Sequence, residues 1–268
     1  MSPARAHEIL DRPQSGLTDA LRSELSKLFS VRSTTWTLTA AVASNVLLAA
    51  LAAIFLPSRL SAHEKATVDS IQVSLAGLHL SQLAFGVLGV LVITSEYNTG
   101  SIRSTLSAIP RRRMMLASKT LVFTATALVV GTSACLAAYF VFQAFLGDNS
   151  MRTSISDPGV LRAVLGGGLY LTVLGLLGLG LGTVIRSSAG AIATLFGLLF
   201  VPTILAGILP SAWRNTIGPY LPTNAGEATY SLNPHASALS ASAGLAVFCL
   251  YAATALAAGF YLITHRDA

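Results

Sequence analysis

The sequence predicts an all-α integral membrane protein with six transmembrane helices. Of its 268 residues 53% are hydrophobic and 10% are charged, whereas soluble domains carry about 25% charged residues. Six apolar stretches reach the length of about 20 residues that a helix needs to cross a bilayer. We place the spans near residues 35–56, 74–95, 114–142, 159–185, 189–209 and 238–263. Residues 35–268 are therefore expected to form a single six-span domain.

The first 34 residues are expected to lie outside the spans. Residues 1–16 form a polar tail that lacks the apolar centre of a cleavable signal peptide. Residues 17–34 follow as an amphipathic helix, and one of its faces is apolar. The apolar face carries Leu17, Leu21, Leu25, Leu28 and Phe29. Such a helix lies in the membrane interface and leads into a span. A surface helix of a small soluble domain is the weaker alternative, because nothing apolar precedes it to pack on.

The distribution of Lys and Arg predicts the orientation of the chain. With the N-terminus inside, twelve of the seventeen basic residues lie in inner segments and five in outer segments. Positive charge favours the cytoplasmic side. Both termini are therefore expected in the cytoplasm and the protein in the plasma membrane. The same topology accounts for the net charge of +6, so we expect no nucleic-acid partner.

The connection between the second and third spans is the most polar one on the inner side. It runs from Glu96 to Arg113 and contains a short amphipathic helix over residues 99–109. Apolar side chains recur on one face of this helix, at Ile102, Leu106 and Ile109. The following proline, Pro110, ends the helix. We interpret the segment as a docking helix held between two spans.

Three local patterns predict helix ends. Asp157 precedes Pro158, and Asn233 precedes Pro234. A capping side chain before a proline is typical of a helix start. The second pair predicts a last helix that protrudes beyond the membrane. The third pattern is the short polar stretch at Arg186, which predicts a tight hairpin between the fourth and fifth spans.

The last outer connection, residues 210–238, combines prolines with apolar and aromatic side chains. This composition predicts short helices that lie in the outer interface. Asn224 stands three residues before Glu227, which resembles a capping box for a helix over residues 225–232.

The fourth span is rich in glycine. Gly178 and Gly182 form a G-x-x-x-G pair, which permits close approach of two helices. Glycine is frequent in membrane helices, so the pair does not locate an interface between chains.

Several kinds of chemistry are missing from the sequence. No G-x-x-x-x-G-K-[ST] stretch is present to hold nucleotide phosphates. No zinc-binding spacing of His or Cys occurs, and no charged residue lies near the centre of a span. An intramembrane enzyme and an ion-coupled carrier are both disfavoured. The chain itself is expected to bind no cofactor and no metal.

A few polar side chains lie within the predicted spans. Asn45, His79 and Gln82 are our candidates for a substrate path, because polar residues inside a membrane are often functional. The alternative for each one is a hydrogen bond between helices, worth about 0.6 kcal/mol on average.

Three motifs resemble the permease subunits of ABC exporters of the second type, particularly small actinobacterial ones. The central motif is Glu96-Tyr-x-x-Gly100-Ser-Ile-Arg103-x-Thr-Leu106, followed by Pro110-Arg-Arg and Lys119. Lys27-Leu-x-Ser-Val-Arg-Ser-x-x-Trp36 leads into the first span, and Tyr220-Leu-Pro-Thr-Asn-Ala-Gly226 lies in the last outer loop. Together with the six spans, these landmarks cover most of the chain.

The resemblance implies roles for particular segments. Residues 17–34 would be the elbow helix, and residues 99–109 the coupling helix, which fits a cleft of a separate cytoplasmic ATPase subunit. The coupling residues would be Glu96, Tyr97, Gly100, Ile102, Arg103, Leu106 and Ile109. Gly100 would allow a sharp turn, and Arg103 would pair with Glu96 or with an acid on the partner. Tyr220, Asn224 and Glu227 would form an outer-loop gate.

The leading hypothesis is the membrane subunit of an ATP-driven exporter of a hydrophobic or amphipathic compound, such as a natural product, an antimicrobial peptide or a lipid. ATP and magnesium would be bound by the partner ATPase, and a second permease chain, identical or paralogous, would complete the path. The alternative is a non-transporting scaffold or sensor subunit that recruits an ATPase.

Overall fold

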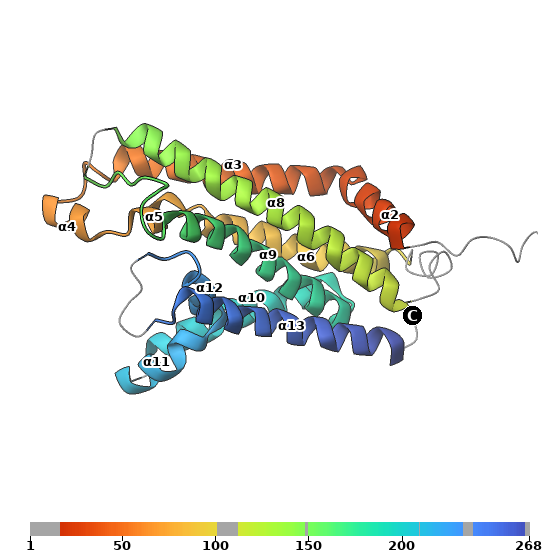
Figure 1. Ribbon diagram of the computed structural model, residues 1–268. Helices are drawn as coiled ribbons and strands as arrows, with labels where there is room; N and C mark the ends of the chain where they lie inside the picture. The colour runs from red at the N-terminus through yellow and green to blue at the C-terminus, as the bar shows by residue number, and fades with distance from the viewer. Residues whose placement is uncertain (1–16, 101–111, 148–149, 209, 233–237, 266–268) are drawn as a thin grey trace, which may run out of the picture.

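Six long helices form the body of the protein (Figure 1). The computed structural model describes residues 17–100, 112–147, 150–208, 210–232 and 238–265. The long helices are α3 (Arg32–Phe55), α6 (Leu78–Asn98), α8 (Arg112–Leu146), α9 (Val160–Ile185), α10 (Ser188–Ile208) and α13 (Ala241–His265). Each is long and apolar enough to cross a membrane. The predicted fold class, an all-α membrane protein with six spans, is confirmed.

Shorter helices gather at the two ends of this bundle (Figure 1). At one end, where α13 also ends, lies α2 (Leu17–Ser30). The opposite end carries α4 (Ala62–Thr67), α5 (Ser70–Ser74), α11 (Ser211–Ile217), the 3-10 turn η1 (Gly218–Tyr220) and α12 (Pro222–Glu227). We call these the α2 end and the α4 end.

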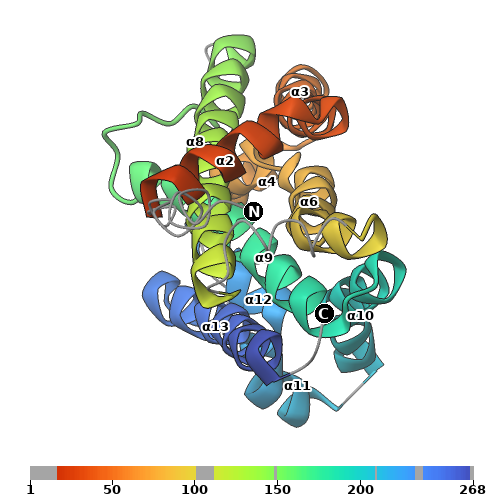
Figure 2. The same ribbon diagram turned by 90° about the vertical axis from the view of Figure 1, so that its right-hand side faces the viewer.

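The helix α9 is the centre of the bundle (Figure 2). It packs against α6, α8, α10 and α13, and glycine allows the close contacts. A Cβ atom on Gly178 would lie 2.6 Å from the carbonyl oxygen of Gly86, and one on Gly180 would lie 2.7 Å from the backbone nitrogen of Leu256. The G-x-x-x-G pair therefore packs on α6 within the same chain.

The helix starts predicted at Asp157 and Asn233 differ from the structure, whereas the tight turn predicted at Arg186 is present between α9 and α10. The helix α9 begins at Val160, after Gly159 with a φ of 85°. Asp157 does not cap this helix, because its Oδ2 accepts a hydrogen bond from the Ser154 nitrogen at 2.7 Å. Asn233 lies outside the described residues, but the predicted long last helix is wrong. Residues 238–240 are not helical and α13 begins at Ala241.

The predicted helix over residues 225–232 is also wrong. The helix found there is α12, which begins at Pro222 and ends at Glu227. Proline suits the first position of a helix, since its missing N–H has no partner there anyway. The Asn224 side chain forms no capping box, because its Nδ2 donates to the Gly218 carbonyl at 2.8 Å.

The amphipathic helix α2 ends earlier than residue 34. Val31 has an extended backbone, with φ −85° and ψ 108°, and separates α2 from α3. One non-helical residue thus links α2 to the first long helix.

Candidate functional site

The structure describes three of the seven predicted coupling residues. Glu96 and Tyr97 lie in the last turn of α6, and Gly100 follows that helix with a φ of 70°. Glycine adopts this left-handed conformation without steric cost, as a sharp turn after α6 requires. The other four, Ile102, Arg103, Leu106 and Ile109, lie outside the described residues. The structure therefore shows the two flanks of the connection: the end of α6 and the start of α8.

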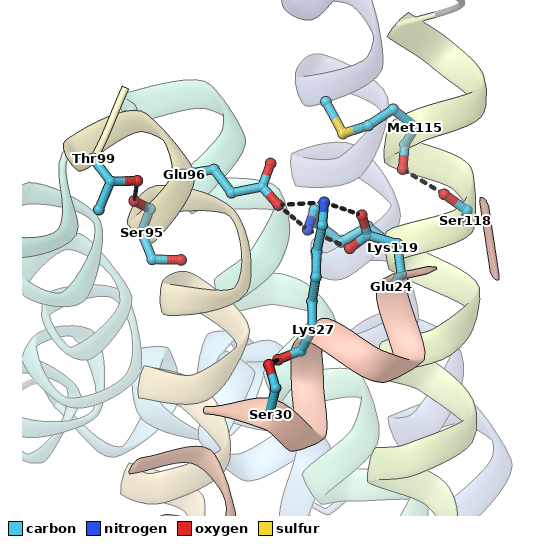
Figure 3. A network of polar contacts seen from close by, with 9 residues as sticks. All are labelled: Glu24, Lys27, Ser30, Ser95, Glu96, Thr99, Met115, Ser118 and Lys119. Atoms are coloured by element: carbon cyan, nitrogen blue, oxygen red, sulfur yellow. Dashed lines mark hydrogen bonds and ion pairs between the residues drawn. The ribbon is translucent and has the colours of Figure 1, made fainter. Parts of the chain in front are cut away.

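Four charged side chains from three helices meet at these flanks (Figure 3). The charge cluster consists of Glu24 and Lys27 of α2, Glu96 of α6 and Lys119 of α8. The Lys119 Nζ lies 2.5 Å from Glu24 Oε2 and 2.9 Å from Glu96 Oε1. The Lys27 Nζ lies 2.9 Å from Glu24 Oε1 and 3.2 Å from Glu96 Oε1. Each charge therefore contacts two charges of opposite sign, and the cluster is neutral.

The charge cluster is buried on one side and open on the other. The side chains of Glu24 and Lys119 are each 3% exposed, that of Glu96 is 10% exposed, and that of Lys27 is 41% exposed. Burial lowers the pKa of Lys27, but the hydrogen bonds and charges of Glu24 and Glu96 outweigh it, so that the pKa is raised. A buried charge that loses its partner costs much free energy. The two flanks and α2 are thus held in one arrangement.

Glu96 makes its ion pairs with lysines. The predicted pairing of Glu96 with Arg103 lies outside the described residues. The second carboxylate oxygen, Oε2, is buried and accepts no hydrogen bond from any residue in the described ranges.

The end of α6 is also bound to the turn between α9 and α10. The guanidinium of Arg186 lies over the Tyr97 ring, 5.2 Å from its centroid. Ser188 Oγ accepts a hydrogen bond from Asn98 Nδ2 at 2.9 Å and lies 2.7 Å from Thr94 Oγ1. Arg186 has a φ of 60°, a conformation that non-glycine residues rarely adopt. The predicted tight hairpin between α9 and α10 is therefore in contact with the end of α6.

The start of α8 contacts the last helix. Arg112 Nη1 donates to the Ile263 carbonyl of α13 at 3.2 Å. The flanks of the α6–α8 connection are therefore linked to α2, to the α9–α10 turn and to α13.

The apolar residues predicted for the elbow helix divide between two surfaces. Leu28 is buried and Leu21 is half-buried, whereas Leu25 and Phe29 are 47% and 49% exposed. The Leu17 side chain lies outside the described part. The buried line of α2 consists of Ala20, Glu24 and Leu28. Sequence reasoning missed Glu24, although its spacing of four from both neighbours on this line places it on the packed face.

The candidate path residues do not share one surface. Gln82 is buried and accepts a hydrogen bond from the Tyr170 hydroxyl, whereas His79 is exposed. Asn45 is fully buried and packs closely on Gly77, because a Cβ atom on Gly77 would lie only 2.3 Å from the Asn45 Cα. The structure thus shows a helix–helix hydrogen bond at Gln82, and a role of the three residues in a substrate path stays a prediction.

The predicted gate residues lie at the α4 end. Asn224 and Glu227 line a cavity of about 440 Å³ together with Arg214 and Gln72. Tyr220 is 52% exposed, and its carbonyl accepts a hydrogen bond from the Tyr251 hydroxyl at 3.3 Å. Gating by these residues stays a prediction.

The comparison with known families decides the class of the protein. The model of the family described as ABC-2 family transporter protein matches residues 83–268. The chain belongs to this family. It is a multi-pass membrane subunit of an ABC transporter. Subunits of this family form the membrane part of the transporter and are not themselves catalytic. A search of curated proteins found no match. The matched range contains Glu96 and Lys119 of the charge cluster but neither Glu24 nor Lys27.

Proposed function

We propose that this chain is the membrane subunit of an ATP-driven exporter, which moves a hydrophobic or amphipathic compound out of the cytoplasm or the inner leaflet. A separate ATPase chain binds ATP and magnesium and docks on residues 99–109. A second permease chain, a copy or a paralogue, completes the path. The α2 end and both termini face the cytoplasm.

The observation that carries this proposal is that side-chain contacts join the end of α6 to the start of α8 in a chain that belongs to the ABC-2 family. Lys119 joins α8 to α6 through Glu96, so a force on the connection acts on both helices together. Contacts at Tyr97 and Arg112 extend from these flanks to the α9–α10 turn and to α13. Docking on residues 99–109 would therefore reach five long helices: α6, α8, α9, α10 and α13.

The nature of the proposed cargo rests on the spans. No charged residue lies near the centre of any predicted span, and buried charge in a membrane is otherwise a mark of ion or polar-solute pathways. A largely apolar path suits a compound that already partitions into the bilayer.

The first test is copurification with the ATPase whose gene lies beside this one, followed by ATP hydrolysis assays with and without amphipathic compounds. A stable complex with compound-stimulated hydrolysis is expected. Hydrolysis that ignores every compound would favour the scaffold alternative. Failure to form a complex would contradict the docking assignment.

A variant sharpens this test. Ile102→Asp is expected to insert normally and to abolish hydrolysis by the complex, because it places a charge on the apolar face of residues 99–109. Ile217→Asp is the matched control, since Ile217 is exposed on α11 at the opposite end. Normal hydrolysis in the Ile102 variant would remove the coupling role.

A further inference from the structure

The helix α2 depends on Glu24 for its attachment to the bundle. It lies across α8 and leads into α3 (Figure 2). Two apolar side chains of its packed line, Ala20 and Leu28, are buried, while Leu25 and Phe29 are about half exposed. The strongest polar link is the pair of Glu24 and Lys119, in which both side chains are 3% exposed.

A buried ion pair is an unusual way to attach a helix. Desolvation of both charges offsets much of their attraction, and apolar residues of similar size often stabilise a protein as well or better. What such a cluster does provide is one defined arrangement, because each charge must meet its partners. The charge cluster fixes α2 against α6 and α8 at the two flanks of the connection.

The ion pair of α2 with α6 is weaker. Lys27 contacts Glu96 at 3.2 Å, but its side chain is 41% exposed. Exposed ion pairs contribute little, because water screens them. Of the two α2 residues in the charge cluster, Glu24 is therefore the one that fixes α2 more strongly.

We propose that Glu24 is a positioning residue of the transport cycle, which makes α2 move with the flanks of the α6–α8 connection and passes that movement to α3. The inference rests on the proposed function for the source of the movement. It goes beyond the family match, which begins at residue 83 and does not include α2 or α3. Only Val31 separates α2 from α3, so a displacement of one helix is transmitted to the other.

The first experiment uses the chain alone in lipid nanodiscs, with Cys135 and Cys249 replaced by Ala. Spin labels at Ser26 of α2 and Ser95 of α6, both exposed, report the position of α2 through their distance distribution. Glu24→Gln is expected to broaden this distribution. Glu64→Gln is the matched control, because Glu64 is an exposed acid that caps α4 at the other end. An unchanged distribution in the Glu24 variant would overturn the proposal.

The second experiment uses the complex with its ATPase. Labels at Ser58, just after α3, and at Asn215 on α11 report movement of α3 at the α4 end, with and without ATP and vanadate. We expect a shift in the parent protein. Glu24→Gln should lower the ratio of shifted to unshifted molecules about 2- to 30-fold, which corresponds to the coupling energies of residues that link distant sites, while ATP hydrolysis continues. A parent protein that hydrolyses ATP without any shift would overturn the proposal.

A double variant separates positioning from simple charge balance. The double variant, with both Glu24→Gln and Lys119→Gln, leaves the neutral pair of Lys27 and Glu96. The fall in melting temperature caused by Glu24→Gln alone is therefore expected to be reversed. The shift should stay reduced, because α2 is still not joined to α8. Recovery of both would overturn the proposal. Absence of an ATPase complex would instead contradict the proposed function, and the distances in the chain alone would still decide whether Glu24 holds α2.

Discussion

The two ends of the bundle are held together by different kinds of contact. At the α2 end, charged side chains on three helices bind one another in the charge cluster. At the α4 end, two charged side chains bind the backbone of residues 229–232. Asp69 Oδ2 accepts a hydrogen bond from the Leu232 nitrogen at 2.7 Å, and Arg162 donates to the Thr229 and Ser231 carbonyls at 3.2 Å and 3.0 Å.

Aromatic packing completes the α4 end. The Tyr170 ring stacks on Phe248 at a centroid distance of 5.4 Å and contacts Tyr230 at 5.5 Å. The backbone contacts of Asp69 and Arg162 tie residues 229–232 to the bundle whichever side chains those residues carry. Contacts between side chains on helices, in contrast, fix the helices relative to one another. The comparison teaches that the position of helices is specified at the α2 end, where ATPase docking is proposed.

The largest effect is expected from breaking the α2 end at its most buried charge. Lys119→Leu leaves Glu24 and Glu96 with only the partly exposed Lys27 as a shared partner, and removal of one member of a buried ion pair costs about 3–5 kcal/mol. Unfolding of the purified protein in detergent measures this loss. Lys65→Leu on α4 serves as the control, and equal stability of the two variants would show that the charge cluster contributes nothing.

A smaller effect is expected from breaking the backbone contacts of the α4 end. Asp69 also caps α5, with Oδ1 accepting from the Ile71 and Gln72 nitrogens. Asp69→Ala is expected to cost about 1–3 kcal/mol through loss of the cap and of the Leu232 hydrogen bond. Faster hydrogen exchange at Leu232 and Ile71 would show the local release. Asp157→Ala should leave both amides protected, and equal exchange in the two variants would contradict the assignment.

A neutral contact sharpens the comparison further. Tyr170→Phe removes the hydroxyl that donates to Gln82 but keeps the stacked ring. Hydrogen bonds between membrane helices average about 0.6 kcal/mol and reach about 1.7, so the loss of stability should fall in this range. Tyr261→Phe, at an exposed ring of α13, is the control. A loss as large as that of Lys119→Leu would refute the distinction between charged and neutral contacts.

The smallest effect concerns pH. The raised pKa of Lys27 means that its contribution is complete below the unfolded-state pKa of about 10.4 and disappears as the pH rises through the folded-state value. Because Lys27 is partly exposed, we expect a loss below about 1 kcal/mol. The stability of the parent should therefore fall slightly more than that of Lys27→Gln in alkaline solution. Parallel curves for the two proteins would contradict this.

The fold could be predicted because bilayer thickness imposes the length of each apolar stretch. The helix starts assigned from a single capping residue could not be predicted. Asp157 and Asn224 both have side chains suited to capping, but each binds a nearby backbone group instead. Such choices depend on how the neighbouring turn is folded, which a pattern of single residues does not contain.

The candidate site could be predicted only in part for a similar reason. Glu96 and Gly100 were identified from a motif, and the structure puts Glu96 in the last turn of α6 and Gly100 directly after that helix. Their role in coupling stays a prediction. Glu24 was missed because a helical wheel groups apolar residues, and an acid among them counts against burial. Its partner Lys119 is 95 residues away in sequence. Which helix faces α2 is tertiary information, and no spacing within α2 reveals it.

The central place of α9 constrains how the protein is made. Helices α6 and α8 are synthesised before α9, but the glycine face at Gly180 packs on α13, which leaves the ribosome more than 50 residues after α9 ends. Until α13 is inserted, that face has only lipid or a chaperone to cover it. Packing of α9 must therefore wait for α13, and a ribosome that stops before residue 241 releases a bundle with its middle helix uncovered on one side.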